Sequence, residues 1–206
     1  MTSDDITIHR GLTGVYFDRS ATTFIDGKNG VLEYRGYNIN QLAEHSTFEE
    51  TGYLLIHGKL PTQAELNDFD AELKAARELP EQVFDVLELV KDSHPMDALR
   101  TAVSALASFD EDRNDNSPEA TIRKGNRLTS QVPSIVMAHH NIRQGKDPIK
   151  PSTVLNHAGN FLYMLNGDEP SAATAELMDK DFVLHADHGS NASAFTARVV
   201  AGTAAD

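Results

Sequence analysis

The sequence predicts a mainly α-helical fold with one small β-hairpin near the N-terminus. Beyond residue 38, signals for helix starts recur: a hydroxyl side chain or a proline precedes an amphipathic run. Extended runs are confined to residues 21–37. With 206 residues and 40% hydrophobic content, the chain is long enough to bury one sizeable core.

The β element is expected in the stretch ATTFIDGKNGVLEYRGY. Two short extended runs, Thr22–Ile25 and Val31–Tyr34, flank the sequence DGKNG. Glycine and asparagine tolerate the positive φ angles of tight turns, so a small hairpin is the natural interpretation. Residues 1–20, which precede it, are expected to form an N-terminal arm.

Two capping boxes are predicted in the first long helices. Ser46 and Glu49 would open the run FEETGYLLIHG, and Thr62 and Glu65 would open the run AELNDFDAELKAARE. In this motif the hydroxyl and the carboxylate each bind a backbone N–H group that has no partner within the helix.

Prolines and serines mark the starts of the later helices. Pro80 and Pro95 are expected in first turns, where the missing N–H group is no loss. Ser117 is expected to start a longer helix that runs to about Arg143 with Pro133 inside it.

The last third of the chain is expected to hold two more helices. The Pro-Ser pair at 151–152 would open the helix TVLNHAGNFLYML, and Asn166-Gly167 would close it. The Pro-Ser pair at 170–171 would open a final helix that runs without interruption to the end of the chain.

A polar cluster interrupts the apolar pattern of this final helix, in the stretch DFVLHADHGSNASAF. On a continuous helix with about 100° per residue, His188 and Asn191 fall on the same stripe as Leu184 and Phe195. We therefore expect both polar side chains to point inward. An unpaired buried polar group costs about 1–3 kcal/mol, which favours a polar pocket on this face.

Three interpretations of the cluster remain open on the residues alone. His185 and His188 could bind a metal, with Asp187 or another histidine as a third ligand, although the chain has no cysteine and no second motif of ligand spacing. They could be core histidines bonded to backbone carbonyls. They could also form a ligand site in which a neutral, desolvated His188 donates a hydrogen bond to a substrate oxygen.

The composition argues against several classes of partner. The formal net charge of −13 disfavours nucleic acid and anionic membrane surfaces. No apolar run approaches the roughly 18 residues of a membrane span. The first ten residues, MTSDDITIHR, lack the basic and apolar pattern of a signal peptide, so a cytoplasmic location is expected.

Four separated segments resemble the citrate synthase family, in the order in which that family uses them. They are VLEYRGYNINQLAEHSTFEETGYLLIHGKLPT (31–62), HPMDALRTAVSAL (94–106), NFLYML (160–165) and LHADHGSNASAFTARVVAGT (184–203). The resemblance begins at about Gly11 and is strongest to the shorter bacterial citrate and 2-methylcitrate synthases.

The resemblance implies a mainly helical homodimer or higher homo-oligomer with a large domain and a small domain. The implied reaction is the first step of the tricarboxylic acid cycle, in which an acyltransferase condenses acetyl-CoA with oxaloacetate and water to give citrate and CoA. Acetyl-CoA is a substrate there, and neither a cofactor nor a metal is expected. By resemblance, His188 and Asn191 would bind oxaloacetate, with His185 as a further candidate.

Two departures from the family pattern limit this interpretation. Gln63 stands where the 2-methylcitrate branch has an arginine, which favours citrate synthase. 2-Methylcitrate synthase, which uses propionyl-CoA, and a non-catalytic helical binding module remain the alternatives.

The second departure is that the family's later motifs are missing. We therefore expect residues 21–206 to be the N-terminal part of the large domain. The small domain and the catalytic residues would follow Asp206, and the chain alone would be inactive.

Overall fold

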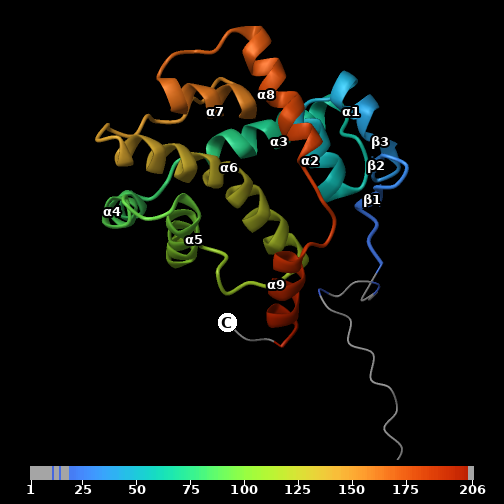
Figure 1. The fold of residues 1–206 in the computed structure, drawn as a ribbon, viewed down its shortest axis with the longest axis horizontal. Helices are drawn as coiled ribbons and strands as arrows, with labels where there is room; N and C mark the ends of the chain where they lie inside the picture. Colours follow the sequence, from blue (N-terminus) through green and yellow to red (C-terminus); the bar gives the residue numbers. More distant parts are fainter. Residues whose placement is uncertain (1–10, 12–13, 15–18, 204–206) are drawn as a thin grey trace, which may run out of the picture.

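The computed structural model describes Gly11, Gly14 and residues 19–203, so most of the expected N-terminal arm lies outside the described residues. Within that part, nine α-helices and three short strands follow one another, with the strands first (Figure 1). The prediction of a mainly α fold with a small β element near the N-terminus is confirmed.

The β element is an antiparallel hairpin with a short third strand. Strands β1 (Thr23–Asp26) and β2 (Val31–Tyr34) pair so that Thr23 lies opposite Tyr34. The Asp26 carboxylate closes the turn by accepting hydrogen bonds from Lys28 and Asn29. The predicted hairpin is confirmed, and strand β3 (Tyr37–Asn38), which was not predicted, extends the sheet.

Helices α1 (Ile39–His45), α2 (Phe48–His57) and α3 (Gln63–Ala75) follow the sheet. The capping box predicted for α3 is confirmed, since Thr62 Oγ1 accepts from Glu65 N at 3.3 Å and Glu65 Oε2 accepts from Thr62 N at 2.8 Å.

The capping box predicted for α2 was wrong by one residue. Thr47 and Glu50 form it, with Thr47 N donating to Glu50 Oε2 at 2.8 Å and Glu50 N donating to Thr47 Oγ1 at 3.2 Å. Ser46 and Glu49 fit the same spacing, but Glu49 is buried and binds a distant helix. Local sequence could not separate the two overlapping boxes.

Helices α4 (Glu81–Leu89), α5 (Pro95–Leu106) and α6 (Pro118–Arg143) build the largest apolar core, with the 3-10 turn η2 (Ala107–Phe109) after α5. Its buried members come from all three α-helices: Val83, Leu87, Ala102, Leu106, Ile135, Ala138 and Ile142. In Figure 1, α6 runs diagonally through the molecule, with α4 and α5 on one side of it. Pro95 lies in the first turn of α5 as predicted, whereas Pro80 is the residue before α4.

Helix α7 (His157–Asn166) is shorter than predicted, because it begins at His157 and not near residue 153. Asn156 is its N-cap and accepts from Gly159 N at 2.8 Å. The preceding segment is instead held by the buried Arg77 guanidinium, whose Nη1 donates to Ser152 O at 2.6 Å and to Leu155 O at 2.8 Å. The predicted end at Gly167 is confirmed, with φ of 83°.

The predicted uninterrupted final helix is wrong. Helix α8 (Ala172–Leu184) ends before the polar cluster, a loop follows, and α9 (Ala192–Gly202) begins after Asn191. The break has a local cause, because Gly189 adopts a positive φ of 66° and Asn191 caps the next helix. The expected stripe of Leu184, His188, Asn191 and Phe195 on one helix face therefore does not exist.

In the described part of the chain, none of the helices combines the length and the apolar character that crossing a membrane requires.

Candidate functional site

The candidate residues lie together on the loop from His185 to Asn191, between α8 and α9. His185, His188 and Asn191 are all exposed. The expectation that His188 and Asn191 point inward is therefore wrong for this chain, because it rested on a continuous helix. The loop nevertheless presents the three side chains within seven residues of one another.

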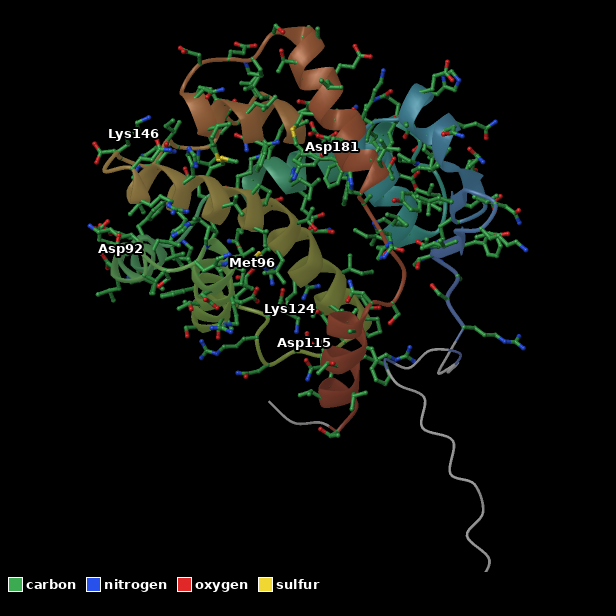
Figure 2. The ribbon with its side chains drawn as sticks, viewed as in Figure 1. Asp92, Met96, Asp115, Lys124, Lys146 and Asp181 are labelled. Carbon is green, nitrogen blue, oxygen red and sulfur yellow. The ribbon has the colours of Figure 1, made fainter. Side chains whose placement is uncertain are left out.

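His185 is held against the last turn of α8. Its Nδ1 lies 2.8 Å from Asp181 O and 3.4 Å from Asp181 Oδ1. Figure 2 labels Asp181 on α8, the helix from which the loop departs. These contacts orient the imidazole of His185 along α8, so it lies at the start of the loop.

Asn191 has a structural function as the N-cap of α9. Its Oδ1 accepts a hydrogen bond from Ala194 N at 2.9 Å. The cap uses the side-chain oxygen, so the amide nitrogen can still donate to a ligand. A ligand near this amide would also lie near the N-terminus of α9, where the helix dipole favours negative charge.

The loop contacts the β-hairpin on its inner side. Tyr34 Oη donates to Leu184 O and Asp187 O, each at 3.1 Å, and accepts from Asp187 N at 3.3 Å. The Asp187 carboxylate accepts from Thr23 Oγ1 and from Gly189 N. Burial raises the pKa of the Tyr34 hydroxyl, which therefore stays protonated and able to donate at neutral pH.

An apolar pocket of about 220 Å³ lies next to the loop. Its walls come from α2 and α3, including Phe48, Leu55 and Phe69, while Ala186 and Asp187 contribute the loop side. The pocket thus borders the loop at Ala186 and Asp187, whereas His188 is exposed to solvent.

Sequence reasoning missed a buried acidic network beneath α8. The Asp179 carboxylate accepts from Phe48 N at 3.2 and 3.3 Å, and Glu49 Oε1 accepts from His157 N at 2.7 Å. Each carboxylate therefore binds the first turn of a different helix, α2 and α7 respectively. Because the partners are more than 100 residues apart, only the three-dimensional arrangement reveals this network.

Burial perturbs every ionisable group of this network. Desolvation, reinforced by the nearby Glu49 charge, raises the pKa of Asp179 to about 6. Desolvation also raises the pKa of Glu49. The pKa of His157 falls to about 4, first because of burial and second because of the Arg77 charge. The imidazole of His157 stacks on Phe48 with ring centroids 4.6 Å apart.

No group of three or more His, Asp, Glu or Cys side chains among the described residues is arranged to hold a metal ion. His185 and His188 in particular do not form such a group with Asp187, whose carboxylate is bonded to Thr23 and Gly189.

Comparisons with known proteins identify the family. The family model described as "Citrate synthase, C-terminal domain" matches residues 11–206. The chain is 47% identical over 200 residues to a citrate synthase of Deinococcus radiodurans, covering 97% of the chain and 53% of that relative. It is 48% identical over 204 residues to a citrate synthase of Haloferax volcanii, covering 97% and 54% respectively.

Solved structures agree with the sequence matches. The citrate synthase of Pyrobaculum aerophilum superposes with a TM-score of 0.92 at 38% identity, covering 97% of this chain and 52% of that one. The citrate synthase of Thermotoga maritima gives a TM-score of 0.83 at 36% identity, with the same coverage. The chain spans about half the length of the curated relatives it matches. Across that span, the chain belongs to the citrate synthase family.

Proposed function

We propose that this chain contributes the oxaloacetate-binding loop of a citrate synthase, an acyltransferase that condenses acetyl-CoA with oxaloacetate and water to give citrate and CoA. His188 donates a hydrogen bond to an oxaloacetate oxygen, and the Asn191 amide supports the same ligand, with His185 beside them. The observation that carries this proposal is their clustering on one exposed loop of a chain in the citrate synthase family.

The electrostatics of the loop are consistent with an anionic ligand. Asn191 caps α9, so a carboxylate bound there would meet the positive end of that helix dipole. The chain has a formal net charge of −13, however, and oxaloacetate is a dianion. We propose that the cationic groups that complete the site, and the catalytic acid and base, belong to the half of the relatives that this chain does not span.

Residues 21–206 are proposed to be part of the large domain of such an enzyme, which works as a homodimer or higher homo-oligomer in the cytoplasm. The isolated 206-residue chain is then expected to be inactive. Release of CoA, followed with a thiol reagent in the presence of acetyl-CoA and oxaloacetate, tests this directly. Turnover by the isolated chain would contradict the proposed division of the active site.

The role of His188 is tested in the chain joined to the other half that its relatives possess. His188→Ala removes a hydrogen bond to a charged ligand, so the KM for oxaloacetate should rise about 10- to 100-fold. His45→Ala, which removes an exposed histidine of α1, is the matched control and should leave the KM unchanged. An unaltered KM for oxaloacetate in His188→Ala would overturn the assignment.

A second candidate is 2-methylcitrate synthase, with propionyl-CoA in place of acetyl-CoA. A 2-methylcitrate synthase of Mycobacterium tuberculosis is 38% identical over 200 residues, covering 97% of the chain and 50% of that relative. Comparing kcat/KM for the two acyl-CoA substrates in the same joined protein distinguishes the candidates. We favour acetyl-CoA, because the more similar relatives from Deinococcus radiodurans and Haloferax volcanii carry the name citrate synthase.

A further inference from the structure

The hairpin and the candidate loop meet through a pair of side chains that the hairpin itself aligns. Thr23 on β1 and Tyr34 on β2 are directly opposite each other in the antiparallel register. Opposite residues in such a ladder place their side chains on the same face of the sheet. Both hydroxyl groups therefore reach the same segment, which lies about 150 residues later in the sequence.

Tyr34 binds the loop at the point where α8 ends. Its side chain is fully buried, with 0% exposure. The hydroxyl group contacts the carbonyl of Leu184, the last residue of α8, and both backbone polar groups of Asp187. Loss of the hydroxyl would remove the partner that these part-buried backbone groups share, which weakens the contact between hairpin and loop.

Thr23 acts one step further along the loop, through Asp187. It donates to Asp187 Oδ2, and Gly189 N donates to the same oxygen at 3.1 Å. Asp187 and Gly189 are the two chain neighbours of His188. The backbone on both sides of His188 is thus fixed by one carboxylate, which the hairpin holds in place.

On the other side of the loop, α9 is less deeply buried than the hairpin residue Tyr34. Within the described part of the chain, α9 contains no fully buried residue, and Phe195 is half-buried. The ribbon in Figure 1 shows α9 apart from α7 and α8, connected to α8 by the loop. The hairpin contacts therefore hold the loop at Asp187, next to His188.

We propose that Thr23 and Tyr34 are positioning residues for oxaloacetate binding, acting through Asp187 to hold His188 in its binding orientation. The inference rests on the proposed function for its ligand. Its structural part, control of the loop by the hairpin, is independent of that function and can be measured on the isolated chain.

The structural part is tested by amide hydrogen exchange in the 206-residue chain. Tyr34→Phe and Thr23→Val should speed exchange at Asp187 and Gly189 by about five- to tenfold, the effect of losing one hydrogen bond. Tyr37→Phe, the same change at the β3 residue paired with Tyr34, and Thr23→Ser, which keeps the hydroxyl, should not. Exchange within α6 serves as the internal reference. Unchanged exchange in the loop of Tyr34→Phe and Thr23→Val would overturn the proposal.

The functional part is tested with the joined protein used for His188→Ala. Tyr34→Phe and Thr23→Val should raise the KM for oxaloacetate about five- to tenfold and leave the KM for acetyl-CoA unchanged. Thr23→Ser should keep the wild-type KM for oxaloacetate. A general loss of folded protein would instead lower kcat without this selectivity.

These outcomes distinguish failure of the positioning role of Thr23 and Tyr34 from failure of the proposed function. Faster loop exchange with an unchanged KM for oxaloacetate would show that the pair orders the loop without serving the ligand, which overturns the positioning role. If the wild-type joined protein shows no turnover and binds no oxaloacetate, the proposed function fails, and the exchange data alone decide whether the hairpin controls the loop.

Discussion

Asp179, Glu49 and His157 connect three helices through two carboxylates that are almost inaccessible to water. The exposed fractions of Asp179, Glu49 and His157 are 6%, 5% and 4% respectively. Each charge that forms there therefore loses most of its hydration. The two backbone N–H groups bound by the carboxylates offset part of that loss. The network therefore makes the stability of the fold depend on pH, through the shifted pKa values of Asp179 and His157.

Asp179 is expected to destabilise the fold when it ionises. Because its pKa is about 6 in the fold and 3.8 without perturbation, its ionisation destabilises the fold progressively as the pH rises from about 4 to about 6. Asp179→Asn keeps an acceptor for Phe48 N but does not ionise. At pH 7 this variant should be more stable than the wild type, on the order of 1–2 kcal/mol after allowance for solvent screening. At pH 4 the two should be equal.

Stability is measured as the urea midpoint of unfolding at several pH values between 4 and 8. His157→Phe is the companion variant. The pKa of His157 is about 4 in place of 6.5, so its contribution has the opposite sign and is lost as the pH falls through this window. Phenylalanine keeps the stacking on Phe48 without titrating. Stability of His157→Phe should then fall less steeply on acidification than that of the wild type. A stability difference between variant and wild type that stays constant from pH 4 to pH 7, in either variant, would contradict the assignment.

At the scale of residues, the sequence identified which side chains to consider but not how they point. His188 and Asn191 were predicted from their residue types and from a family resemblance, and the structure places them on one loop. Their inward orientation was wrong, since it depended on helical geometry that Gly189 and the Asn191 cap interrupt. Glu49 and Asp179 could not be predicted, because their partners lie on distant helices.

At the scale of elements, helix starts depend on which of two adjacent hydroxyl groups occupies the N-cap. Ser46 and Thr47 both have glutamate three residues later, and the fold selects Thr47 because Glu49 is needed inside, against His157. Similarly, Asn156 is the N-cap of α7, while Ser152 accepts hydrogen bonds from Val154 N and Leu155 N within the preceding loop. Tertiary contacts thus decide between local signals of equal strength.

This choice leads to a prediction for the N-terminus of α2. Thr47→Ala removes the cap and should lower the free energy of unfolding by about 1 kcal/mol. Ser46→Ala removes a neighbouring hydroxyl that is not the N-cap and should cost less than half as much. Chemical denaturation of both variants at pH 7 measures the difference. Equal losses would show that the two hydroxyl groups share the capping function.

At the scale of the whole molecule, the mainly α class and the order of hairpin before helices could be predicted from the sequence. Caps and turn residues act locally, so they can be recognised from the sequence alone. The division into a tightly packed body and a separate α9 could not be predicted, because the apolar pattern of 192–202 is that of a packed helix. In the described part of the chain, α9 nevertheless buries none of its residues, and Val199 and Val200 are about half exposed.

The exposure of α9 leads to a prediction on its dynamics. Isolated helices shorter than about 12–15 residues are marginal in water, and α9 has 11 residues with little packing to support it. Amides in α9 should therefore exchange at least tenfold faster than those in α6 when the 206-residue chain is measured alone. Slow exchange in α9 would indicate that another surface, such as a second copy of the chain, covers Val199 and Val200.

The hydrogen bonds between Tyr34 and Asp187 have a consequence for biosynthesis. They join residues 153 positions apart, so the hairpin emerges from the ribosome long before its partner exists. At about 5–20 residues per second, the delay is roughly 8–30 s. Tyr34, which is fully buried in the folded chain, remains without its hydrogen-bond partners during that time. Contacts of such long range form slowly even after the chain is released. If a chaperone shields the nascent hairpin, we expect a larger effect on the fraction of chains in which the loop that carries His188 folds correctly than on the fraction in which any helix forms.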